Sequence, residues 1–306
     1  MKSLSLNSAL LRWLNTRLSF LRKIAGKQLH LDVPAAATSS DESRSYRKEI
    51  AASNLCAVTH SGPNRSANED DFAFGCENRV IIVADGLGGH AGGSVASRIG
   101  CEAAVASMQR TLSSGANEDD KQEASDRVSQ ALSDAHLAIV EHAAQHPELK
   151  GMGCTMVLAW IANPDIHIAH VGDARAYHLA DQNLQCLTKD HSFVARLVEL
   201  GEITSEEAET NPNKNVILQA VGAAETLRPS VTSIEMRQGE RLLLCSDGLW
   251  DALPFDQIAR LLGGSLDVAG TVSSLIDAAI EANASDNITA AVFECDKVDG
   301  TKLQKK

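Results

Sequence analysis

The sequence predicts an α+β fold in which the strands form meanders and the helices are grouped apart from them. Apolar runs at 151–161, 168–173 and 174–179 follow one another across short turns with no helix between them, as antiparallel strands do. The helical patterns at 94–108 and 126–145 do not alternate with single strands as in βαβ units. Aspartates close several of the strand patterns, which suggests a site for a hard metal ion at the strand ends.

Composition indicates one globular domain with two tails. The 306 residues are 44% hydrophobic and 22% charged, which is ordinary for a soluble protein. We expect a basic N-terminal helix and linker at 1–50, the main domain at 51–296 and a charged tail at 297–306. No apolar run approaches the roughly 20 residues that a membrane span needs.

Charge and cysteine usage exclude several classes of function. Residues 1–31 carry six basic and no acidic residues, so the remainder carries 22 basic against 40 acidic residues, a net charge of −18. Such a surface is unsuited to nucleic acid. The seven cysteines are scattered and never spaced as C-x-x-C, which predicts neither a zinc site nor a disulfide framework and favours the cytoplasm.

The N-terminal segment is predicted to be a basic amphipathic helix. Leucines at 10, 11, 14, 18 and 21 share one helical face, with basic residues mostly opposite, and 34–45 is a polar linker. Three destinations stay open: docking on its own domain, a peripheral membrane surface, or a protein partner. A transit peptide is a further reading of its arginines and serines.

The first half of the domain begins with a predicted strand at 54–59. In the next loop Arg65 precedes an acidic cluster by four residues. A β-branched run from Val80 then ends in Asp85-Gly86, typical of a buried strand and a sharp exit. Of the two helices that follow, 126–145 presents Val128, Leu132, Ala135 and Ile139 on one buried face.

The second half continues the meander and closes with a helix and a strand. The segment 189–210 is predicted to be helical, with Phe193, Leu197 and Leu200 inward and a capping box formed by Thr204 and Glu207. A core strand at 242–245, a helix at 267–281 and a last strand at 288–293 follow.

Carboxylates at strand ends suggest a metal site. Asp85, Asp173 and Asp247 each follow an apolar run, and no matching set of basic residues accompanies them. Such groups would repel one another unless cations bound between them. Single histidines at 170, 178 and 191 and the cysteines at 154 and 245 are interpreted as structural residues.

Seven motifs in order resemble the metal-dependent serine/threonine protein phosphatases of type 2C, in their bacterial form. They are RSANED at 65–70, VADGLGGHAGG at 83–93, GMGCTMV at 151–157, HVGDARAY at 170–177, TKDHS at 188–192, CSDGLWD at 245–251 and SDNITAAV at 285–292. The resemblance runs from about 53 to 295 and implies a four-layer α-β-β-α sandwich with two antiparallel sheets and a metal centre at one end.

The resemblance implies roles for individual residues. Two Mn²⁺ or Mg²⁺ ions, with a weaker third, would be held by Asp85, Gly86, Asp247, Asp286, Asp70, Glu69 and Asp173. Asp85 would bridge the two core ions, Asp173 would join the third, and Arg65 would bind the substrate phosphate. Animal members carry a histidine after the Asp-Gly pair; here Leu87 stands there and His90 lies three residues on, so protonation of the leaving group by His90 or by water stays open.

The implied function is hydrolysis of phosphoserine and phosphothreonine in proteins by a metal-activated water, opposing a serine/threonine kinase. We expect a cytoplasmic monomer with phosphorylated protein substrates, no nucleic-acid partner, and membrane or partner docking through residues 1–31. A regulatory pseudophosphatase is one alternative, although it would be expected to lose one of Asp85, Asp247 and Asp286, which are all present. A phosphatase of small phosphorylated molecules is another.

Overall fold

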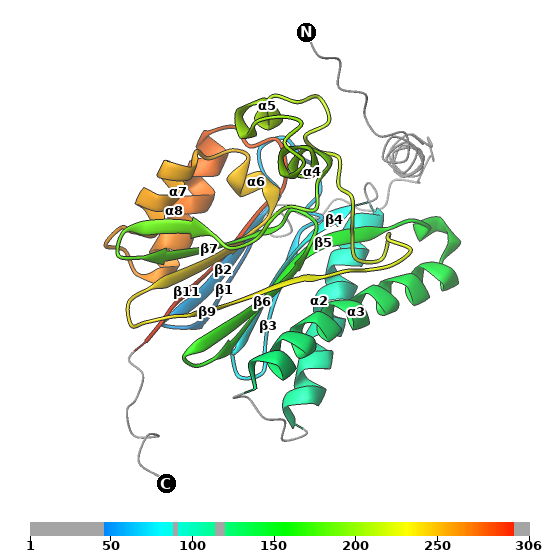
Figure 1. Ribbon diagram of the computed structural model, residues 1–306, viewed down its shortest axis with the longest axis horizontal. Helices are drawn as coiled ribbons and strands as arrows, with labels where there is room; N and C mark the ends of the chain where they lie inside the picture. The colour runs from blue at the N-terminus through cyan, green and yellow to red at the C-terminus, as the bar shows by residue number, and fades with distance from the viewer. Residues whose placement is uncertain (1–45, 88–90, 114–119, 297–306) are drawn as a thin grey trace, which may run out of the picture.

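Two antiparallel sheets lie face to face with helices on both outer faces (Figure 1). The computed structural model describes residues 46–87, 91–113 and 120–296. Its layers run α2 and α3, the five-stranded sheet, the six-stranded sheet, then α7 and α8. The predicted four-layer sandwich is therefore confirmed.

The six-stranded sheet has the strand order β1-β2-β11-β10-β7-β8, with every pairing antiparallel. The last strand of the domain pairs here with the second, because β2 lies against β11 with Ala57 opposite Ala291. The strands are β1 (Tyr46–Ala52), β2 (Leu55–His60), β7 (Arg175–Ala180), β8 (Asn183–Cys186), β10 (Arg241–Cys245) and β11 (Ile288–Glu294).

The five-stranded sheet has the order β3-β4-β5-β6-β9 and is also antiparallel throughout. Its central strand β5 is buried along almost its whole length, because one sheet covers one face and helices cover the other. The strands are β3 (Asp71–Gly75), β4 (Val80–Leu87), β5 (Gly153–Ala162), β6 (Asp165–Val171) and β9 (Ser230–Glu235).

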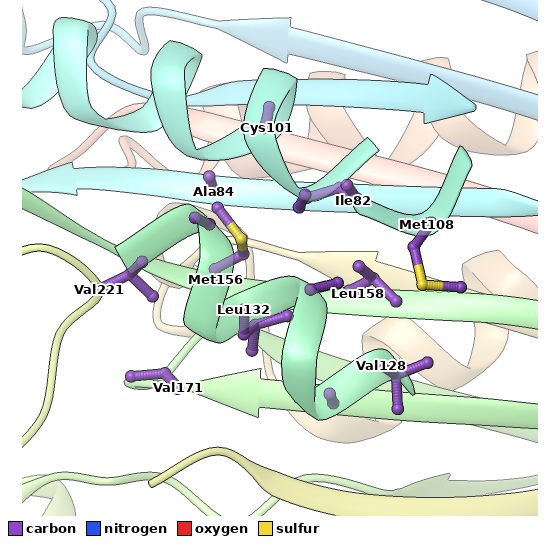
Figure 2. Packing of buried hydrophobic residues seen from close by; sticks show 14 of the residues in the cluster. Ile82, Ala84, Cys101, Met108, Val128, Leu132, Met156, Leu158, Val171 and Val221 are labelled. Carbon is purple, nitrogen blue, oxygen red and sulfur yellow. The ribbon is translucent and has the colours of Figure 1, made fainter. Parts of the chain in front are cut away.

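Helices α2 (Ala91–Ser113) and α3 (Lys121–Gln145) cover the five-stranded sheet. The carboxylate of Asp120 begins α3 by accepting from the backbone N–H groups of Gln122 and Glu123, as an N-cap does. Leu132 and Ile139 then pack against Met156 and Leu158 of the sheet in one apolar cluster. Figure 2 shows this layer from close by.

The six-stranded sheet is covered by α7 (Phe255–Leu262) and α8 (Val268–Glu281). A short helix α6 (Asp247–Trp250) follows β10 directly. The connection from β8 to β9, residues 187–229, carries α4 (Phe193–Glu199) and α5 (Ser205–Glu209), and the predicted capping box of Thr204 and Glu207 is present. A 3₁₀ turn, Pro147–Leu149, links α3 to β5.

Two expectations need correction. Strand β1 crosses the domain boundary expected at residue 50, so the sheet takes in residues from Tyr46 onward. In α4 the buried residue is Val194, whereas Leu200, expected inward, is 39% exposed. The reason is that α4 is only seven residues long and ends at Glu199, so that Leu200 is its C-cap and no longer on its inward face.

The expectations on residues 1–45 and 297–306 lie outside the described residues. Among the helices that the structure describes, none has both the length and the apolar character required to cross a membrane.

Candidate metal centre

Strand register brings the predicted carboxylates to one edge of the sandwich. Asp71 pairs with Ala84 across β3 and β4, so Asp70 lies beside Asp85. The end of β10 meets the start of β11, where Cys245 pairs with Ala290, so the residues just outside them, Asp247 and Asp286, come to one edge.

The turn that carries Asp173 lies at the same edge of the five-stranded sheet. Asp85 pairs with Thr155 of β5, and the next residue of β5, Met156, pairs with Val171 at the end of β6. The backbone then turns at Gly172, whose φ is +94° and whose Cβ would lie 2.5 Å from the Thr155 side chain. Only glycine fits this turn, because the φ and the close contact both exclude a side chain.

Asp70 is held by hydroxyl groups from two other strand ends. Its Oδ2 accepts hydrogen bonds from Ser246 Oγ and from Thr289 Oγ1, both at 2.7 Å. Thr289 is joined in turn to Thr59 at 2.7 Å, and Thr59 accepts from Asn68 Nδ2 at 2.8 Å. The buried network fixes one oxygen of Asp70, and the other, Oδ1, has no partner among the described residues.

Asn287 fastens the loop before β3 to the start of β11. Its Nδ2 donates to the carbonyl oxygens of Ser61 and Ala67, both at 2.8 Å, and its Oδ1 accepts from the Glu69 N–H at 2.8 Å. Through Asn287, the acidic segment 69–70 is therefore held close to Asp286, the residue before it.

The backbone of Gly86 lies in close contact with two other segments. A Cβ at this residue would lie 2.4 Å from the Gly93 carbonyl oxygen and 2.5 Å from the Glu69 carbonyl oxygen. The Ser97 hydroxyl donates to the same Glu69 carbonyl at 2.6 Å. Glycine at position 86 therefore lets β4, α2 and the acidic loop meet beside Asp85.

The carboxylates raise one another's pKa. Burial raises the pKa of Asp85 well above its ordinary value, and the charges of Asp70, Asp247, Asp173 and Asp286 raise it further. Burial likewise raises the pKa of Asp70 to about 7 and that of Asp247 to about 6. The pKa of Asp173 is raised by burial first and then by Asp247. These groups therefore repel one another when ionised.

Arg65 lies at the exposed rim of this group. Its Nη2 donates to Asp286 Oδ2 at 2.7 Å and its Nε to the Ser285 carbonyl at 3.2 Å, while about half of its side chain is exposed. A guanidinium has five N–H donors, so donors remain for an anion from solvent.

The donor set fits a hard divalent cation. One oxygen each of Asp70, Asp173 and Asp247 is buried with no hydrogen-bond partner in the described chain, and carboxylate and carbonyl oxygens suit Mg²⁺ and Mn²⁺. Within 46–87, 91–113 and 120–296, however, no three His, Cys, Asp or Glu side chains already have the spacing of a formed metal site. Asp286 is turned to Arg65 and Asp70 to its two hydroxyls, so an ion would have to compete with these donors.

Some of the expected residues lie elsewhere. Residues 88–90, and with them His90, lie outside the described residues. The three histidines that were interpreted as structural have hydrogen-bond partners. His170 pairs with the Lys189 carbonyl, His178 with Glu240 and His191 with Ser230. All seven cysteines are free, and burial raises the pKa of the Cys154 and Cys245 thiols.

Sequence reasoning missed the neutral residues that hold the carboxylates. Ser246, Thr289, Thr59 and Asn68 carry no charge or periodic pattern that would have indicated them. The available signal was adjacency, since Ser246 directly precedes Asp247 and Asn287 directly follows Asp286.

Comparison with known proteins supports a single family. Residues 59–281, more than half of the chain, match the family model of protein phosphatase 2C. The serine/threonine protein phosphatase PstP of Mycobacterium tuberculosis is 35% identical over 241 residues, which cover 78% of this chain and 44% of that relative. The chain thus spans less than half the length of this relative. The serine/threonine phosphatase stp of Listeria monocytogenes is 33% identical over 242 residues, which cover 78% of this chain and 94% of the relative.

Solved structures agree with the architecture. The catalytic domain of a serine/threonine protein phosphatase PstP, crystallised in complex with two manganese ions, superposes with a TM-score of 0.67 at 32% identity, and the match covers 81% of this chain and 97% of that one.

Proposed function

The chain belongs to the protein phosphatase 2C family, and from this premise we propose that it is a metal-dependent protein serine/threonine phosphatase. One observation carries the proposal: aspartates from five separate segments meet at one edge of the sandwich and raise one another's pKa. A protein maintains such repulsion at a cost in stability, which is typical of a functional site. The two manganese ions in the crystal structure of the PstP catalytic domain support a metal at this edge.

We assign the metal ligands by position. Asp85 lies at the centre of the group, since the charges of the other four aspartates all raise its pKa. It is proposed to contribute to the binding of both ions, and the Gly86 carbonyl to that of one of them. Asp247 and Asp286 would hold one ion, and the acidic pair Glu69 and Asp70 the other. Asp173, on its own turn, would join a weaker third ion. When bound, such ions supply Lewis acidity that makes a water a nucleophile near neutral pH.

The protein's own groups would bind and orient the phosphate. Arg65 is proposed to donate to the phosphate oxygens, as a guanidinium does well. Its present partner, Asp286, is a proposed metal ligand. An ion on Asp286 would therefore free the guanidinium for substrate, so that phosphate binding by Arg65 would be linked to metal binding. No residue of the described chain is assigned as the proton donor to the leaving group.

The test is hydrolysis of matched peptides. Phosphoserine, phosphothreonine and phosphotyrosine peptides of one sequence would be incubated with the full chain in Mn²⁺, in Mg²⁺ and in excess chelator. We expect phosphate release from the first two peptides only with a metal. Full turnover in chelator would contradict the proposal, and release from small phosphate esters without release from any phosphopeptide would favour a metabolite phosphatase instead. A regulatory pseudophosphatase would release no phosphate at all.

Partners and location follow as further proposals. A protein serine/threonine phosphatase requires a serine/threonine kinase to supply its substrates, so we propose that such a kinase acts in the same compartment. Seven free cysteines are in keeping with a reducing cytoplasm. The basic residues of 1–31 suit peripheral attachment to an acidic membrane or protein surface. We also propose that the catalytic domain acts as a monomer.

A further inference from the structure

The side chain of Trp250 joins two of the segments that carry carboxylates. Helix α6 has Asp247 as its first residue and Trp250 as its last. The Trp250 indole Nε1 donates a hydrogen bond of 3.0 Å to the backbone carbonyl of Asp173. A single short helix therefore presents one carboxylate and, three residues on, holds the turn that presents another.

The indole ring is itself held in place by Arg175. The guanidinium carbon lies 3.5 Å from the centroid of the Trp250 ring. Its Nε and Nη2 donate to the two oxygens of Asp190 at 3.0 and 2.7 Å, and its Nη1 donates to the Tyr177 hydroxyl at 3.2 Å. This bidentate ion pair and the cation–π contact fix the plane of the ring and hence the direction of its N–H.

The same turn is held from its other side by the β8–β9 connection. The His191 N–H donates to the Gly172 carbonyl at 2.8 Å, and the Gly172 N–H donates to His191 Nδ1 at 3.3 Å. Further along this connection, Lys214 Nζ reaches both oxygens of Asp251, the residue after α6, at 2.8 and 3.0 Å. The turn, α6 and the β8–β9 connection thus form one hydrogen-bonded unit.

Such a restraint is needed because the turn presents a carboxylate against repulsion. The Asp173 side chain is only 4% exposed, and its Oδ1 has no partner among the described residues. Asp173 and Asp247 interact as like charges. The turn begins with glycine, the residue with the greatest backbone freedom, so without an anchor it could move its carboxylate away from Asp247.

We propose that Trp250 is a positioning residue, which fixes the Asp173 carboxylate relative to Asp247 so that both can contribute to cation binding. This inference rests on the proposed function. It concerns a neutral side chain that contributes no metal-ligating atom, and it acts through a backbone carbonyl rather than through the carboxylate itself.

The test compares two tryptophans in the full chain. Trp250→Phe keeps an aromatic face for Arg175 and removes the indole N–H, together with some ring volume that the control variant loses as well. Trp160→Phe is the matched control, because Trp160 is fully buried in β5 and its Nε1 has no hydrogen-bond partner in the described structure. Both variants would be measured for the Mn²⁺ concentration that gives half-maximal hydrolysis of a phosphothreonine peptide, and for the rise in Tm on adding Mn²⁺.

We expect Trp250→Phe to need about 2- to 10-fold more Mn²⁺, the range that one hydrogen bond supplies, and to gain less Tm from Mn²⁺ than the wild type. Trp160→Phe should match the wild type in both measurements. A Trp250→Phe variant that also matches the wild type would overturn the proposal.

A double-mutant cycle separates positioning from general destabilisation. Asp173→Ala removes the carboxylate but keeps the carbonyl that accepts from Trp250. In this background Trp250→Phe should still lower the Tm, since the hydrogen bond is still lost, but should no longer shift the Mn²⁺ dependence. An undiminished shift would refute action through Asp173. A wild-type chain whose rate and Tm ignore Mn²⁺ would instead contradict the proposed function.

Discussion

The buried carboxylates destabilise the metal-free protein, because several like charges lie close together. Asp247 shows this most simply, because burial and, after it, the charge of Asp286 raise its pKa to about 6. The unfolded value is 3.8, so between these two pH values the folded state binds more protons than the unfolded state. Stability is therefore lost as the pH rises through this window.

We predict that Asp247→Asn raises the stability of the metal-free protein while abolishing most of its activity. The amide keeps the shape of the side chain and removes the charge. In chelator, the variant's advantage in free energy of unfolding should grow from pH 4 to pH 6 and then stay constant, at about 1–3 kcal/mol. Thermal melts across this pH range, together with rates on a phosphothreonine peptide, would check it; we expect a loss of about 100-fold or more in rate.

Mn²⁺ provides the control for this prediction. At pH 8 it should raise the Tm of the wild type more than that of Asp247→Asn, because the variant lacks a charged ligand. Equal stabilisation of the two proteins by Mn²⁺ would mean that Asp247 is not a ligand.

The aspartates could be predicted from sequence because each has a local signal. Asp85 and Asp247 end an apolar run and precede a glycine, and register then brings them together. The residues that hold these aspartates in place could not be predicted from sequence. Asp70 is bonded to Ser246 and Thr289, which lie 176 and 219 positions away in the sequence, and a hydroxyl next to a strand has no pattern that names its partner.

Helix α3 is part of the helical layer on the five-stranded sheet. Two of its leucines show which side chains stabilise the fold. Leu132 is fully buried in the cluster between this helix and the sheet (Figure 2). Leu137, on the same helix, is 55% exposed. The two residues therefore have the same side chain and lie on the same helix, but they differ in how much apolar surface they bury.

We predict that Leu132→Ala lowers the free energy of unfolding by about 2–5 kcal/mol, the usual range for a buried leucine. Leu137→Ala should change it by less than about 0.5 kcal/mol. Denaturant unfolding in the presence of Mn²⁺ measures both, and the Mn²⁺ concentration for half-maximal rate should stay that of the wild type in each. A shift in that concentration would mean that α3 is coupled to the metal centre.

The elements that sequence predicted are helices with a long buried face and strands with a continuous buried apolar run. The four residues expected inward on α3, from Val128 to Ile139, are all buried. Strands β8 and β9 were not predicted, because β8 has only four residues and β9 lies at a sheet edge with several exposed side chains. The misplacement of Leu200 has the same origin, because the seven residues of α4 make only about two helical turns, too few to define a period.

The arrangement of layers depended on the resemblance rather than on any single pattern. Composition alone indicates a globular domain but cannot say which sheet pairs with which helices. Strand β1 was missed because it follows a polar linker, yet it completes one edge of the six-stranded sheet by pairing Tyr46 with His60 and Glu49 with Ala57. The domain therefore starts earlier than its motifs do.

This boundary sharpens the expectation for the N-terminal segment. A chain that begins at residue 46 keeps β1, whereas one that begins at residue 54 loses it and leaves the buried strand β2 at an open edge. Exposed edges with apolar side chains promote aggregation. We predict that removal of residues 1–45 leaves the rate on a small phosphate ester within about threefold of the full chain, since no proposed site residue precedes Arg65, while removal of residues 1–53 lowers the Tm and the yield of monomer.

The full chain and the chain that begins at residue 46 also test where the basic segment binds. Six basic residues in 1–31 oppose a remainder of net charge −18, so the segment is attracted to acidic surfaces, and attraction between exposed charges is screened by salt within about 10 Å at 0.1 M. The full chain should therefore sediment with anionic vesicles at low salt and dissociate at high salt, while the chain from residue 46 should stay in solution throughout. If neither sediments, the segment binds a protein surface, its own domain included. If the chain from residue 46 is inactive, the segment belongs to the catalytic fold, and the proposal that residues 1–31 serve peripheral attachment is wrong.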